Sequence, residues 1–181
     1  MEYLNNVKYL DEFEVGSKIL VTDPCYSKDT WCTQVLDVKP GIWEAEVVMT
    51  NCDSWGNRVS ELLAWHRDYP TDSADESVSN DIGVDSGQCG FFDFDKYPDG
   101  QCGEYDDPAT FYGAACKETL KEGVPAGVVN GFGVVSSSGY GDGCYNLYVG
   151  RDEHDVIVST RLVFIEEAED YDDEYRNEED E

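Results

Sequence analysis

Apolar and polar residues alternate along residues 42–50. Every second residue from Trp43 to Met49 is apolar, and Glu44 and Glu46 lie between them. This period of two is typical of a strand with one buried face. Residues 58–66, after a short stretch of turn residues, have a pattern that fits a strand or a short helix, and we favour the strand. Because the connection is short, we expect the two strands to form a hairpin.

Other segments complete a β-rich pattern. Residues 18–22 form an apolar run that ends at Asp23-Pro24, which predicts a buried strand entering a turn. Residues 69–81 contain almost no apolar side chains and are interpreted as an exposed loop. Three further strands, joined by short links, are expected at residues 127–137, 144–149 and 156–165. Consecutive strands with short links favour an antiparallel meander.

One helix is expected near residues 108–122. Asp107 suits the N-cap, Pro108 the first turn and Gly123 the position after the last turn. On this interpretation one helix face carries Tyr112, Cys116 and Leu120. The fold class predicted is mainly β (α+β), an antiparallel meander of sandwich-like or barrel-like form with one packed helix.

Acidic residues dominate the charge. The 181 residues include 40 acidic and 12 basic side chains, which gives a formal net charge of -28. Residues 1–165 are expected to form one globular domain, and residues 166–181 a disordered acidic tail. Such a negative surface disfavours direct nucleic-acid binding and contact with anionic membranes. It favours a basic protein partner, unless the charge serves solubility alone.

The cellular context is inferred from what the sequence holds. No apolar run approaches the roughly 20 residues of a membrane span, and residues 1–10 show no export-signal pattern. The seven cysteines are scattered without a Cys-x-x-Cys pair, which favours reduced thiols. We therefore expect a cytoplasmic protein.

Three short motifs lie at predicted strand ends: Asp-Pro-Cys-Tyr at 23–26, Val-Asp-Ser-Gly at 84–87, and Ser-Ser-Ser-Gly-Tyr-Gly-Asp-Gly at 136–143. With them the chain resembles a family of uncharacterised small proteins of bacteria and their phages, over residues 19–165. The resemblance implies a bacterial cell or a phage-infected host as the setting, and carries no activity.

The motifs supply the candidate ligand-binding residues. If the strand ends converge, their carboxylates and hydroxyls could bind a polar ligand or a hard cation such as Ca²⁺ or Mg²⁺. The alternative is ordinary turn chemistry, in which these side chains cap backbone amides. The candidates are Asp23, Cys25, Tyr26, Asp85, Ser86, Ser136, Ser137, Ser138, Asp142 and Tyr145.

Catalytic patterns are weak. Cys25 or Ser138 could act as a nucleophile only with His66 or His154 in hydrogen-bond reach, and neither histidine belongs to a recognisable motif. Residues 95–106 match a calcium loop only in part, because Tyr97 occupies its third position. No cofactor is assigned. The sequence favours an acidic binding or inhibitor protein over an enzyme; the alternative is a small-molecule or cation binder, or a hydrolase, built on the Asp/Ser cluster.

Overall fold

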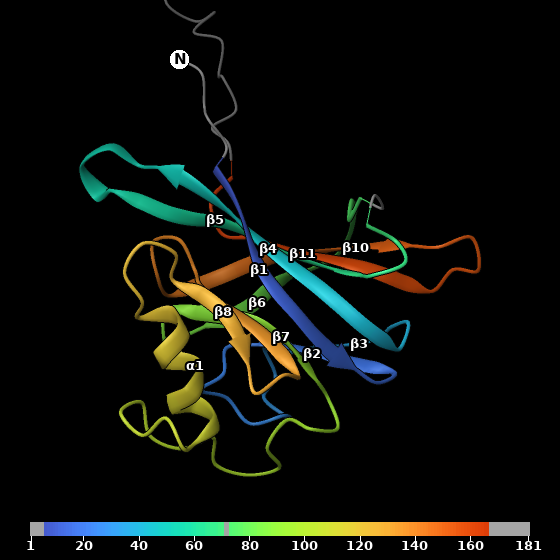
Figure 1. Ribbon diagram of the computed structural model, residues 1–181, viewed down its shortest axis with the longest axis horizontal. Helices are drawn as coiled ribbons and strands as arrows, with labels where there is room; N and C mark the ends of the chain where they lie inside the picture. The colour runs from blue at the N-terminus through green and yellow to red at the C-terminus, as the bar shows by residue number, and fades with distance from the viewer. Residues whose placement is uncertain (1–5, 71–72, 167–181) are drawn as a thin grey trace, which may run out of the picture.

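The computed structural model describes residues 6–70 and 73–166. Within these ranges the chain forms two antiparallel sheets and one α-helix, and the sheets do not close into a barrel (Figure 1). The mainly β, α+β fold class is therefore confirmed. The expected tail lies, apart from Glu166, outside the described residues.

The larger sheet has six strands in the order β1-β4-β5-β11-β10-β6. The expected hairpin is confirmed, because Trp43 pairs with His66 and Asn51 with Asn57 across β4 and β5. The strands of this sheet are β1 (Asn6–Val15), β4 (Gly41–Asn51), β5 (Asn57–His66), β6 (Glu76–Val84), β10 (Gly143–Arg151) and β11 (Ile157–Val163).

The smaller sheet has five strands in the order β3-β2-β7-β9-β8. Its centre is β7, every residue of which is buried. The strand expected at residues 18–22 is confirmed as β2. The strands of this sheet are β2 (Lys18–Thr22), β3 (Gln34–Asp37), β7 (Gln88–Asp93), β8 (Ala126–Val129) and β9 (Gly133–Ser137).

A shared core joins the inner faces of the two sheets. Trp43, Ala45 and Val47 from β4 are fully buried, as the alternating pattern predicts, and pack in one cluster with Val21 and Phe91 of the smaller sheet. Burial of such side chains contributes roughly 1.5–3 kcal/mol each. The core fixes the ends of β2, β6 and β9, from which the polar motifs emerge.

The helix α1 (Phe111–Thr119) is shorter than expected and begins at a different cap. Thr110 is the N-cap, and its hydroxyl accepts from the backbone N–H of Gly113. Asp107 instead accepts from the N–H of Ala109 in the turn before the helix. Leu120 was predicted to lie on the apolar face of the helix. Its side chain is 75% exposed, so this prediction was wrong.

Three other expectations were wrong. The exposed loop assigned to residues 69–81 ends earlier, because β6 begins at Glu76 and pairs with β10. The strand assigned to 127–137 is two strands, β8 and β9, separated by a turn in which Asn130 has a φ of 51°. The meander is also divided, since β9 and β10 belong to different sheets.

Candidate functional site

Asp23 joins two distant loops from inside the protein. Its carboxylate is fully buried and accepts hydrogen bonds from the N–H of Cys25 (2.8 Å), of Asp85 (2.9 Å) and of Ser86 (2.7 Å). The Ser86 hydroxyl donates a fourth bond of 2.6 Å. A buried carboxylate requires such donors, because water no longer solvates it. Asp23 therefore holds the loop after β2 against the loop between β6 and β7.

Tyr26 and Asp85 form the outer part of this junction. The Tyr26 hydroxyl donates a 2.5 Å hydrogen bond to Oδ2 of Asp85. Partial burial, followed by this carboxylate, raises the pKa of Tyr26. The backbone carbonyl of Tyr26 accepts a 2.6 Å bond from the hydroxyl of buried Tyr97. Hydrogen bonds thus hold both the backbone carbonyl and the side-chain hydroxyl of Tyr26.

The third motif lies beside the second. The N–H of Ser138 donates to the carbonyl of Gly87 (3.0 Å), and the Ser138 hydroxyl donates to the carbonyl of Gly141 (2.9 Å). The Tyr145 hydroxyl also donates to the Gly141 carbonyl, at 2.5 Å. Gly141 has a φ of 117°, which a larger residue rarely adopts. Ser138 and Tyr145 therefore support the turn that carries Asp142.

The other two serines of this motif are buried or half-buried at the end of β9. Ser136 is fully buried, and its hydroxyl has no hydrogen-bond partner among the described residues. The Ser137 hydroxyl donates to the carbonyl of Thr119 at the end of α1 (3.4 Å). Ser137 thus contacts the end of α1, and neither serine lines the groove described below.

The side chains that do share an open surface line a groove of about 480 Å³, which we call the acidic groove. Asp85 and Asp142 both lie on it, together with Trp31, whose side chain is 83% exposed. Its lining, taken from the described residues, contains no basic side chain. The lining is Tyr26, Thr30, Trp31, Cys32, Gly83, Val84, Asp85, Asp142, Gly143 and Cys144.

Trp31, Cys32 and Cys144 were missed from the sequence. Trp31 lies in a polar stretch between β2 and β3. A tryptophan in such a loop could have indicated a binding surface. Nothing in the sequence placed Cys32 near Cys144, because their proximity depends on the pairing of β6 with β10.

The arrangement around Cys25 is unsuited to nucleophilic attack. Burial and then the carboxylate of Asp23 raise the pKa of its thiol, which suppresses the thiolate. The two histidines are engaged elsewhere: the Nε2 atom of His66 lies 3.0 Å from the carbonyl of Pro40, and His154 is exposed in the turn between β10 and β11. The contacts of Cys25 and Ser138 thus do not include a histidine base among the described residues.

Residues of the partial calcium-loop pattern at 95–106 take part in packing and in an ion pair. Tyr97 is buried, and Asp99 forms an ion pair with Lys28 (2.9 Å). Across the part of the chain that the structure describes, no group of three or more His, Cys, Asp or Glu side chains is placed to hold a metal ion.

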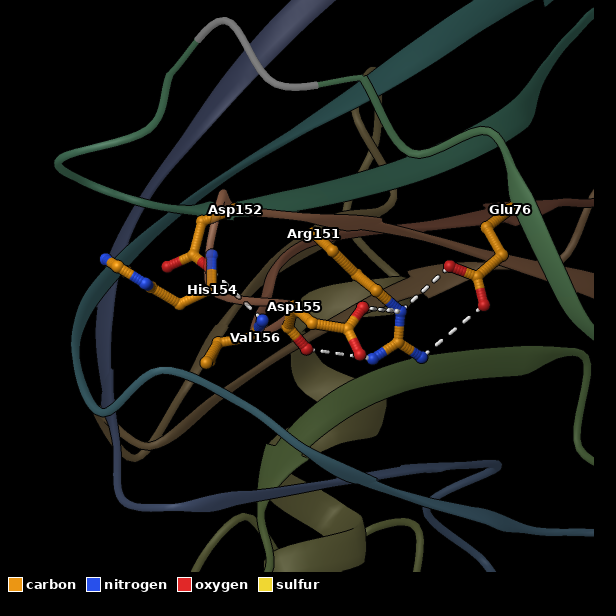
Figure 2. Close-up of polar contacts among 6 residues, drawn as sticks. All are labelled: Glu76, Arg151, Asp152, His154, Asp155 and Val156. Carbon is orange, nitrogen blue, oxygen red and sulfur yellow. Dashed lines mark hydrogen bonds and ion pairs between the residues drawn. The ribbon is translucent and has the colours of Figure 1, made fainter.

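A second polar cluster, drawn in Figure 2, lies where the end of β10 meets the start of β6. The Arg151 Nε donates to Glu76 (2.8 Å), which joins β10 to β6, and Nη1 donates to the carbonyl of Asp155 (3.2 Å). Asp152 accepts from the N–H of Val156 and of His154, and these bonds lower its pKa. The cluster closes the turn, and its basic side chain is already paired.

The chain was compared with protein families, curated proteins and solved structures. No family model, no curated protein and no solved structure matches this chain. The resemblance to small bacterial and phage proteins therefore stays a prediction. No helix among the described residues has the length and apolar character that a membrane span requires.

Proposed function

We propose that the protein binds a basic protein partner, and that an arginine or lysine side chain of this partner enters the acidic groove. The observation that carries the proposal is that Trp31, Asp85 and Asp142 line one groove. A guanidinium or ammonium group gains from both an aromatic face and a carboxylate. The role is non-enzymatic, that of an interaction or inhibitor protein in the cytoplasm of a bacterium or phage-infected cell.

Two further observations support a cationic partner. The full chain has a formal net charge of -28, so long-range attraction favours an encounter with a basic surface. Hydrogen bonds also hold Asp85 in place. Its backbone N–H donates to Asp23, and its carboxylate accepts from the hydroxyl of Tyr26. A preorganised acceptor loses less conformational entropy on binding.

The alternative, a small polar ligand or a hard cation held by the same loops, stays a prediction. Asp23 and Ser86 already bond to one another in the described structure. A ligand would therefore have to use Asp85 and Asp142, which are the exposed carboxylates of the three motifs.

The test uses a nine-residue arginine peptide as the probe and isothermal titration calorimetry as the measurement. The double variant Asp85→Asn/Asp142→Asn should bind about tenfold more weakly than the wild type, since it removes both groove charges. The matched control, Glu104→Gln/Asp106→Asn, removes two exposed charges outside the groove lining. Equal weakening in both double variants would contradict the groove, and no binding by the wild type would contradict the proposed function.

A further inference from the structure

Two cysteine side chains meet over Gly83 in the acidic groove. Cys144 lies directly opposite Gly83 in the ladder between β6 and β10. Opposed residues of an antiparallel pair project to the same face, with Cβ positions roughly 4.5–5.5 Å apart. Gly83 has no Cβ, and the Sγ atom of Cys32 lies 2.7 Å from the place that this atom would occupy. The missing side chain of Gly83 therefore makes room for the Cys32 thiol beside Cys144.

A disulfide between the two thiols requires the loop of Cys32 to move by up to about 4 Å. The Cβ of Cys32 lies 2.8 Å from the same position above Gly83. Its distance from the Cβ of Cys144 is then at most about 8 Å, by addition of the ladder spacing. A disulfide needs about 3.5–4.5 Å between these atoms. Cys32 belongs to a loop, which can adjust more readily than a strand within a sheet.

Exposure determines which thiol reacts first. Cys144 is exposed, whereas Cys32 is buried. The other five cysteines, all within the described residues, are intermediate or buried. Cys25 is also disfavoured because burial and Asp23 raise the pKa of its thiol. An oxidant in solvent therefore reaches Cys144 before the rest.

We propose that Cys32 and Cys144 form an oxidation-responsive thiol pair that closes to a disulfide across Gly83. With hydrogen peroxide as oxidant, the Cys144 thiolate attacks one oxygen, the O–O bond breaks, and a sulfenic acid and hydroxide form. The Cys32 thiol then attacks the Cys144 sulfur and gives up its proton. The S–S bond forms, and the sulfenic hydroxyl leaves as water. Two thiols are oxidised and one peroxide is reduced to two waters.

The disulfide acts on the acidic groove but does not depend on what the groove binds. It ties the loop that carries Trp31 to the start of β10, next to Asp142. The pair therefore fixes the spacing between two walls of the groove in the oxidised protein and releases it in the reduced protein.

Peptide mass spectrometry of the full chain tests the pair. The protein is treated with equimolar hydrogen peroxide, free thiols are alkylated, and the chain is digested without reduction. The expected main product is one peptide pair linked through Cys32 and Cys144. The variant Cys144→Ser should abolish this link, and Cys32→Ser should leave a Cys144 sulfenic acid that dimedone traps. The control Cys52→Ser, which alters a half-buried cysteine outside the groove lining, should retain the link.

Three results would overturn the proposal. They are a predominant link between Cys32 and another cysteine such as Cys25, a dimer joined through Cys144, or peroxide adducts with no link. Gly83→Ala supplies a separate check, because its methyl group would lie 2.7 Å from the Cys32 sulfur and displace it. This variant should form the link more slowly than the wild type when both are folded, as judged by circular dichroism.

Discussion

The buried carboxylate of Asp23 accepts hydrogen bonds from both the backbone amide and the hydroxyl of Ser86, 63 residues further along the chain. A capping contact between residues so far apart differs from the local turn chemistry that Asp-Pro usually provides. It makes one side chain responsible for the relative placement of two loops that contribute to the acidic groove.

Replacement of Asp23 should therefore destabilise the protein strongly. Asp23→Ala removes the acceptor for three backbone amides and one hydroxyl, so we expect a loss of about 3 kcal/mol in the free energy of unfolding. Urea denaturation measures this as a lower midpoint with an unchanged slope. The exposed Asp29→Asn in the same loop is the control and should change stability by less than about 0.5 kcal/mol. Equal midpoints for the two variants would contradict the role of Asp23.

Tyr26 should ionise only at strongly alkaline pH. Its folded-state pKa is raised above the ordinary value of about 10, so its contribution to stability is complete below that pH. The contribution is lost as pH rises toward the folded-state pKa, since the unfolded chain releases the proton more readily. In an absorbance titration at tyrosinate wavelengths, subtraction of the Tyr26→Phe curve should reveal no group titrating near pH 10. A difference curve centred near pH 10 would show that the pKa of Tyr26 is not raised.

Trp31 should affect binding and leave folding unchanged. Its side chain is 83% exposed, so Trp31→Ala should alter the free energy of unfolding by less than about 0.5 kcal/mol. Loss of the aromatic face should weaken binding of the nine-arginine peptide by roughly fivefold, about 1 kcal/mol. The control is Trp55→Ala, another exposed tryptophan that does not line the groove. Calorimetry with equal effects from both variants would argue against the groove as the contact.

Salt should weaken the same interaction. Exposed charges are screened beyond about 8 Å at physiological ionic strength, so the affinity for the basic peptide should fall steeply as salt is added. The double variant Asp85→Asn/Asp142→Asn should show a shallower dependence on salt than the wild type. An affinity that does not respond to salt would instead favour the small polar ligand.

Gly113 provides a test of the α1 cap. On helix propensity alone, Gly113→Ala should stabilise a helix by about 1 kcal/mol. In this structure a Cβ at residue 113 would collide with the backbone carbonyl of Asp107. We therefore expect destabilisation of about 2 kcal/mol, measured by thermal or urea unfolding. The exposed helix residue Lys117, changed to Ala, should remain near the wild type. A more stable Gly113→Ala protein would exclude the close contact at the cap.

The alternating strand β4 was predicted correctly, whereas β6 and β7, which do not alternate along their length, were not. Residues from Trp43 to Met49 alternate, and β4 follows directly. In β7 every residue is buried, so a period of two is absent and the strand was missed. In β6 only the last three residues, Ile82 to Val84, are buried, and its polar first half reads as a loop.

The candidate site was limited by long-range pairing. The motif residues Asp85 and Asp142 were identified from turn composition, and the structure places both on one groove. Turn composition could not distinguish them from Asp23, which also lies in a turn motif after a strand but has a buried carboxylate. Cys32 and Gly83 come together through a backbone hydrogen bond of 3.0 Å between segments 51 residues apart, which no local pattern encodes.

Because the groove is assembled from segments far apart in the sequence, we expect it to form late in folding. Its walls come from the loop after β2, the end of β6 and the start of β10, and closing such long loops costs chain entropy before any contact compensates for it. A nascent or truncated chain that ends before Asp142 would lack both this carboxylate and the Cys144 thiol. The binding proposed for the groove is therefore expected only from a chain that has completed both sheets, and incomplete copies should not compete for a ligand.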